Sequence, residues 1–137
     1  MSFAIAIAGL VLMSQRPAAA TDSAKPAVPF DLVRETPRFT IGKVGFAGHP
    51  SKVETSFREI LSESNAKIQL NRILSTGTKA GQLYALLGLK ILKDPQFKQA
   101  LPHFLSDKSD VETMEGCVVR HTTVKAIAGQ ISNGDIK

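Results

Sequence analysis

Cysteine and histidine are the side chains of this chain best suited to nucleophilic or metal chemistry. Cys117 is the single cysteine, and His121 follows it four residues later. On a helix the two side chains would share a face and could form a thiolate–imidazole pair or half of a zinc site. On a strand they would lie about 13 Å apart, too far to act together. We expect Cys117 to be a small buried hydrophobic residue and His121 to be exposed, so a hydrolase using Cys117 and His121 ranks lowest among the functional hypotheses.

Closely spaced acids are the second group that could do chemistry. A glycosidase needs two carboxyl groups that face each other across a cleft, and neighbouring acids near a loop rarely provide this geometry. We therefore expect solvated surface groups at the two pairs, Glu112 with Glu115 and Asp107 with Asp110. The chain has no G-x-S-x-G or H-E-x-x-H motif. The sequence predicts no catalytic residue, no metal site and no cofactor, and it leaves the binding residues unknown.

Tyr84 is the single tyrosine, and it lies in the most apolar segment of the chain. We expect a core residue whose hydroxyl group reaches a backbone carbonyl or the surface. The alternative is the rim of an apolar pocket, with Phe97 and Phe104 nearby, that holds a lipid or a peptide.

The first 20 residues have the layout of a secretory signal peptide. An uncharged run over Met1–Met13 precedes Pro17 and the small residues Ala18-Ala19-Ala20. The run is shorter than the roughly 20 residues that a membrane span needs. We predict a signal peptide over residues 1–20, a periplasmic or secreted protein, and no stable membrane span. No Lys or Arg precedes the run, which leaves open a start codon further upstream or a simple apolar tail.

Composition limits the class of protein. The formal net charge is +5, but basic and acidic residues are interleaved, as on a mixed solvated surface. This pattern and the predicted export exclude nucleic acid as a partner. One cysteine cannot form an intramolecular disulfide framework, so the fold must depend on its apolar core.

The chain divides into three predicted parts. After the signal peptide, residues 21–38 contain three prolines and little periodicity, so we predict a flexible linker there. Residues 39–137 are predicted to form a single globular helical domain.

Helical periodicity is clear in the middle of this domain. Ser51 and Glu54 match a capping box, in which each side chain accepts the other's backbone N–H. The second helix is expected to end at Gly77 in a left-handed conformation. The segment Thr78–Lys93 has little polar face, so we expect it at the centre of the core with Leu87 fully buried.

Glycines and prolines add further expectations for the helices. Gly81 and Gly88 would allow another helix to approach the central one closely. Asp94 is expected to cap the next helix, and Pro102 to kink that helix or end it early. A last helix is expected to stop at Gly134.

The segment Val111–Val119 is ambiguous between strand and helix. Its β-branched residues favour a strand, whereas the spacing of its apolar residues also fits a helical face. A strand here would pair with the run Phe39–Phe46, because a lone strand cannot satisfy its backbone donors.

The blocks Ala80–Leu89 and Met114–Val119 resemble those of small exported bacterial proteins with no assigned role. The short helical hairpins are similar to units of a HEAT-type repeat. Neither resemblance implies any functional residue.

We therefore predict a mainly α fold, a small bundle of four to five short helices with a minor two-stranded β element. An all-α HEAT-like arrangement is the alternative. The expected function is a non-enzymatic exported interaction or scaffold module that binds another envelope or extracellular protein. The alternative function is a carrier of a small apolar ligand in the helix interior.

Overall fold

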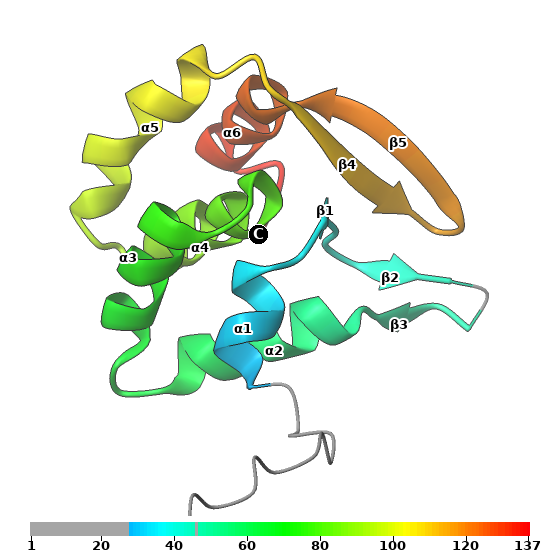
Figure 1. The fold of residues 1–137 in the computed structure, drawn as a ribbon, viewed down its shortest axis with the longest axis horizontal. Coiled ribbons are helices and arrows are strands. Elements are labelled where there is room, and N and C mark those ends of the chain that lie inside the picture. The colour runs from blue at the N-terminus through cyan, green and yellow to red at the C-terminus, as the bar shows by residue number, and fades with distance from the viewer. Residues whose placement is uncertain (1–27, 46) are drawn as a thin grey trace, which may run out of the picture.

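The computed structural model describes residues 28–45 and 47–137. Over these residues the helices are α1 (Pro29–Arg34), α2 (Lys52–Ser62), α3 (Ala66–Thr76), α4 (Lys79–Ile91), α5 (Gln96–Ser106) and α6 (Val124–Asn133). The strands are β1 (Arg38–Phe39), β2 (Lys43–Val44), β3 (His49–Pro50), β4 (Asp110–Glu115) and β5 (Val118–Thr123). The predicted mainly α fold with a minor β element is confirmed, and the strands gather on the right of the molecule in Figure 1. The predicted signal peptide, residues 1–20, and residues 21–27 of the predicted linker lie outside the described residues.

Helix α4 is the centre of the hydrophobic core, as predicted. Thr78 caps its start, because the Thr78 hydroxyl accepts the N–H of Gly81 at 3.0 Å. Every residue from Leu83 to Leu89 is buried, and Leu87 is fully buried. A helix can be apolar on nearly all sides only where neighbours enclose it. The other five helices, β1 and β4 each contribute buried side chains to the same cluster.

Two glycines allow these neighbours to approach α4 closely. A Cβ atom at Gly81 would lie 2.6 Å from the carbonyl oxygen of Val33 in α1. A Cβ atom at Gly88 would lie 2.8 Å from the Leu70 side chain in α3. Both distances are shorter than a Cβ contact allows, so the predicted role of these glycines is confirmed.

Helix α1 lies within residues 21–38, which were predicted to be a flexible linker, and it corrects that prediction for Pro29–Arg34. Pro29 lies in the first turn of α1. A backbone N–H at this position would have no carbonyl partner within the helix, so the proline costs no helical hydrogen bond. Val33 is fully buried in the core, and the N–H of Thr78 donates to the carbonyl of Arg34 at 2.9 Å. The packed domain therefore includes α1, which precedes the predicted boundary at residue 39.

Several helix ends differ in detail from the predictions. Ser51 caps α2 as expected, but the Glu54 carboxylate accepts the N–H of Gly42 at 2.7 Å instead of returning to the cap. Gly77 has a φ of −78° and is not left-handed. Helix α5 continues past Pro102 to Ser106, so the predicted early end is wrong. The left-handed Gly134 ends α6 as predicted.

The sheet has the order β1-β4-β5. Strand β1 runs parallel to β4, with Phe39 opposite Thr113, and β4 runs antiparallel to β5. The strand alternative for Val111–Val119 and its pairing with the Phe39 region are thus confirmed. Strands β2 and β3 form a separate ribbon, and the N–H of Gly45 in its loop donates to the carbonyl of Gly116 at 3.0 Å.

Within residues 28–45 and 47–137, no helix has the length and apolar character needed to cross a bilayer.

Candidate functional site

Cys117 and His121 belong to one hairpin but lie in different surroundings. Gly116 has a φ of 58° and reverses the chain, so Cys117 lies exposed in the turn and not buried as predicted. His121 is exposed on β5, as expected. Its Nδ1 lies 2.8 Å from Asp110 Oδ2, and its Nε2 lies 4.0 Å from Glu112 Oε1. The hydrogen bond and charge of Asp110, with the charge of Glu112, raise the pKa of His121. The imidazole is therefore engaged with carboxylates.

The other acids considered from the sequence each face a cation. The ion pairs are Glu112 with Arg38 (2.7 Å), Glu115 with Arg120 (3.6 Å) and Asp107 with Lys79 (2.6 Å). Hydrogen bonds from Lys79 and Ser109 hold the pKa of Asp107 well below its ordinary value. No two of these carboxylates are held together for acid–base work. Over the described part of the chain, no group of three or more His, Cys, Asp or Glu side chains could hold a metal ion.

Tyr84 is the core residue that the sequence predicts. Its hydroxyl group accepts the N–H of Thr40 at 2.9 Å and donates to the carbonyl of the same residue. Burial raises the pKa of Tyr84 to about 12. The ring packs against Phe39 and Phe57, with centroids at 4.8 and 5.3 Å. Tyr84 thereby fastens the end of β1 to the central helix.

The aromatic residues beside Tyr84 are not the ones predicted to line a pocket there. Phe97 and Phe104 lie on α5, whereas the aromatic neighbours of Tyr84 come from β1 and α2. A depression of about 220 Å³ reaches Tyr84. Pockets for small ligands usually measure roughly 300–1,000 Å³.

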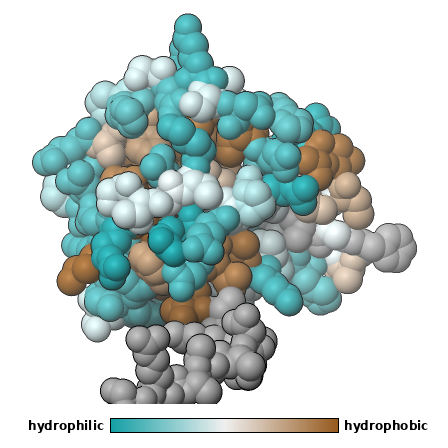
Figure 2. Space-filling view, viewed as in Figure 1, coloured by the Kyte–Doolittle hydropathy of each residue, from teal (hydrophilic) through white to brown (hydrophobic). Residues whose placement is uncertain are grey.

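Strand β5 forms a free edge of the three-stranded sheet, on the outer rim of the molecule (Figure 1). Residues 118–121 are all exposed, and the exposed fractions of Val118 and Val119 are 55% and 40%. Figure 2 shows hydrophobic residues gathered on this β4–β5 hairpin, at the right of the molecule. The strand contains Arg120 and His121 and no acidic residue.

The hydrogen-bond register of the β4–β5 hairpin determines which backbone N–H and C=O groups of β5 point away from β4. The N–H of Val124 donates to the carbonyl of Ser109 at 3.0 Å, which continues the β4–β5 ladder. Alternate residues of an antiparallel strand direct their N–H and C=O to the same side, so residues 118, 120 and 122 face β4. Val119 and His121 therefore direct their backbone groups away from the sheet. Within the described residues, no hydrogen bond reaches these groups.

A groove of about 520 Å³ adjoins this edge. Its lining comes from β1, β4, β5, α6 and the residues around them: Phe39, Ile41, Thr113, Met114, Glu115, Arg120, His121, Thr122, Ile127, Gln130, Asp135, Ile136 and Lys137. Because residues 120–122 belong both to the groove and to the edge, the two form one continuous surface. We call it the β5 surface.

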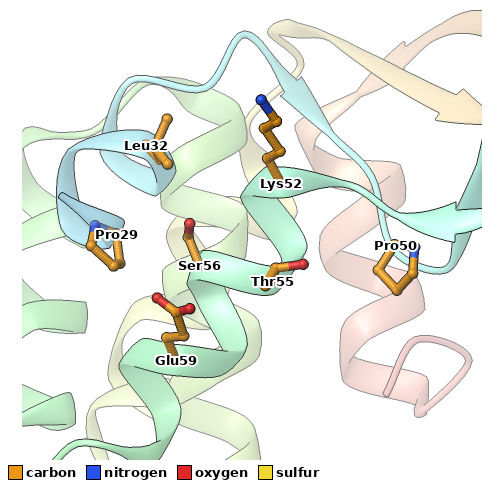
Figure 3. A pocket seen from close by; sticks show the side chains of 7 residues that line it. All are labelled: Pro29, Leu32, Pro50, Lys52, Thr55, Ser56 and Glu59. Atoms are coloured by element: carbon orange, nitrogen blue, oxygen red, sulfur yellow. The ribbon is translucent and has the colours of Figure 1, made fainter. Parts of the chain in front are cut away.

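A second depression, of about 380 Å³, lies between α1 and α2 (Figure 3). Ser56 and Glu59 lie along α2 beside Pro29, while Lys52 stands at the start of that helix. Within the described residues, none of its seven lining residues forms an ion pair. It therefore offers fewer specific contacts than the β5 surface.

Comparisons with family models, with curated proteins and with solved structures give no match to this chain. The functional argument therefore depends on the residues of the chain itself.

Neither β5 as a separate strand nor Arg120 as a candidate binding residue was predicted from the sequence, although a signal was present. Gly116 precedes Cys117 and the β-branched residues Val118 and Val119. Glycine at the first central position of a two-residue turn is typical of a type II′ hairpin.

Proposed function

We propose that this protein is a non-enzymatic exported module that binds another envelope or extracellular protein through the β5 surface. The observation that carries the proposal is the pair of outward-facing backbone units at Val119 and His121, beside the exposed Val118. An unpaired strand edge is a template for a strand from another chain, and proteins usually shorten, cover or charge such edges. Here the edge has six residues and one permanently charged side chain, Arg120.

The state of the ionisable groups also favours binding over catalysis. A general base or nucleophile needs a shifted pKa and free access to a substrate. His121 has a raised pKa, but its imidazole already contacts Asp110 and lies near Glu112 on an open face of the sheet. The signal-peptide pattern of residues 1–20 supports the proposed export and directs the search for a partner to the cell envelope.

Cys117 allows a direct test, because it is the single cysteine and lies exposed in the turn before β5. A photo-crosslinker attached to its thiol should capture the partner in the native envelope fraction. Val119→Pro should abolish this capture, because it removes an N–H that faces away from β4 and leaves the ladder intact. Val119→Thr is the matched control, since it keeps both the N–H and the branched side chain.

Two measurements make the comparison decisive. Circular dichroism and the thermal midpoint should show that both variants fold. Equal capture by Val119→Pro and Val119→Thr would refute binding along the β5 edge.

A carrier of a small apolar ligand is the second candidate, with the groove of the β5 surface, instead of the predicted helix interior, as the site whose volume suits a ligand. The lining argues against a purely apolar ligand, because Glu115, Arg120, Asp135 and Lys137 contribute to it. Such a mixture suits the side chains of a bound peptide better.

A further inference from the structure

We infer that the partner adds an extended, acidic segment to β5 as a fourth strand of the sheet, and this inference rests on the proposed function. The backbone geometry determines the form of the segment. Val119 and His121 each direct one backbone N–H and one C=O away from the sheet. The two residues are two positions apart, and hydrogen-bonded pairs recur at this same spacing in an antiparallel ladder. An extended segment satisfies all of these groups with its own main chain. A helix cannot do so, because its backbone groups are already used internally.

The side-chain alternation of β5 determines where the segment meets charge. Residues of the added strand opposite Val119 and His121 lie on the face that carries Asp110 and Glu112. The residue opposite Arg120 lies on the other face, beside Thr122 and the groove.

Arg120 favours an acid at this opposite position. Its one ionic contact within the described residues is Glu115 at 3.6 Å, and both side chains are largely exposed, 66% for Arg120 and 81% for Glu115. Exposed pairs of this kind contribute little, so the guanidinium remains available to a second carboxylate. A basic residue there would face a like charge directly across the strands, which is unfavourable. Val118 and Val119 favour branched apolar residues at neighbouring positions.

Charge also argues against a second copy of this chain as the occupant. In a symmetric antiparallel pairing of two β5 strands, the register centred on Arg120 places two arginines opposite each other, and the register centred on His121 places two histidines opposite each other. The carboxylates beside His121 favour its charged form, so both of these registers bring like charges together, and the register centred on Val119 gives Arg120 only Val118 as its opposite residue. A segment rich in Glu or Asp has no such conflict, and it complements the overall charge of +5.

Two synthetic peptides test the inference with the full chain. One has the sequence Thr-Val-Glu-Val-Glu-Val-Thr, and the other replaces both glutamates with lysine. Fluorescence anisotropy of the labelled peptides should show at least about fivefold tighter binding of the acidic peptide, the scale of one cross-strand charge pair exchanged for a like-charge pair. Val119→Pro should abolish binding of both peptides, while Val119→Thr should retain it.

Charge reversal on the protein provides the matched pair of variants. Arg120→Glu should reverse the preference between the two peptides. Lys98→Glu makes the same change in net charge on α5, away from the sheet, and should leave the preference unchanged.

The outcomes separate the two proposals. Equal binding of the two peptides, or an Arg120→Glu variant that still prefers glutamate, would overturn the acidic segment even if the Cys117 capture still depends on position 119. Self-association in sedimentation that disappears in Val119→Pro would assign the edge to a second copy and would also overturn it. Loss of the acidic preference in Arg120→Glu but not in Lys98→Glu supports the inference.

Discussion

Replacing Tyr84 with phenylalanine removes one oxygen atom from the core and, with it, two hydrogen bonds to Thr40. The ring contacts with Phe39 and Phe57 remain, because phenylalanine fills the same space. Thr40 is buried, so water has little access to the position of the lost partner. An unsatisfied buried N–H or C=O costs about 1–3 kcal/mol. We expect Tyr84→Phe to lower the free energy of unfolding by about 2–4 kcal/mol.

Alkaline pH gives an independent test of the burial of the same hydroxyl group, because desolvation is the main cause of its raised pKa. In the unfolded chain the Tyr84 hydroxyl ionises with a pKa of 10.0, whereas burial raises the folded value to about 12. Below pH 10 both states keep the proton, so the contribution to stability is fully present. As the pH rises from 10 to 12 the unfolded state loses its proton first, and the contribution disappears. A shift of this size corresponds to about 3 kcal/mol.

The assay is urea unfolding at a series of pH values, for the natural chain and for Tyr84→Phe. Lysines titrate in both proteins, so the difference between the two curves isolates Tyr84. The chain has one tyrosine and no tryptophan, so the phenolate absorbance also reports the pKa of Tyr84 directly. Thr40→Val is the control, because it changes the side chain and keeps both backbone bonds to Tyr84. A Tyr84→Phe variant as stable as the natural chain, or a folded phenolate that forms near pH 10, would refute this account.

Two further predictions concern the core and the export of the chain. Leu87→Ala should lower the free energy of unfolding by about 2–5 kcal/mol, because Leu87 is fully buried in α4. A nearly unchanged melting temperature of this variant would show that the core lies elsewhere. Mass spectrometry of the native protein should find Thr21 as its first residue, and Ala20→Phe should block cleavage and leave a longer precursor in the membrane. A cytoplasmic protein that still begins at Met1 would contradict export.

Sequence patterns best predicted the features that depend on residues close together in the sequence. Ser51 and Thr78 cap helices α2 and α4 through amides three residues away, and Leu87 lies in a run apolar enough to require burial. Helix α1 was missed because it is only six residues long and starts at Pro29 within a proline-rich stretch. Its place is determined by contact with Gly81, far along the chain.

The candidate site depended on features that residue type alone does not determine. Cys117 was expected inside because cysteine is usually buried, but the left-handed Gly116 places it in an exposed turn. The carboxylate of Glu54 bonds to Gly42 across a loop, a contact that a local capping pattern does not indicate. The free edge of β5 became evident only from the strand order of the sheet.

The parallel pairing of β1 with β4 has a consequence for the order of folding. Arg38 and Glu112, which form an ion pair, are 74 positions apart in the chain, and helices α2 to α5 lie between them. Closing such a long loop costs conformational entropy before any contact compensates for it, whereas the β4–β5 hairpin and the individual helices form from near neighbours. The hairpin should therefore form early and remain loosely held until the helices have collapsed and brought β1 into place. Pulse-labelling hydrogen exchange should accordingly protect the amides of α4 before those that join β1 to β4.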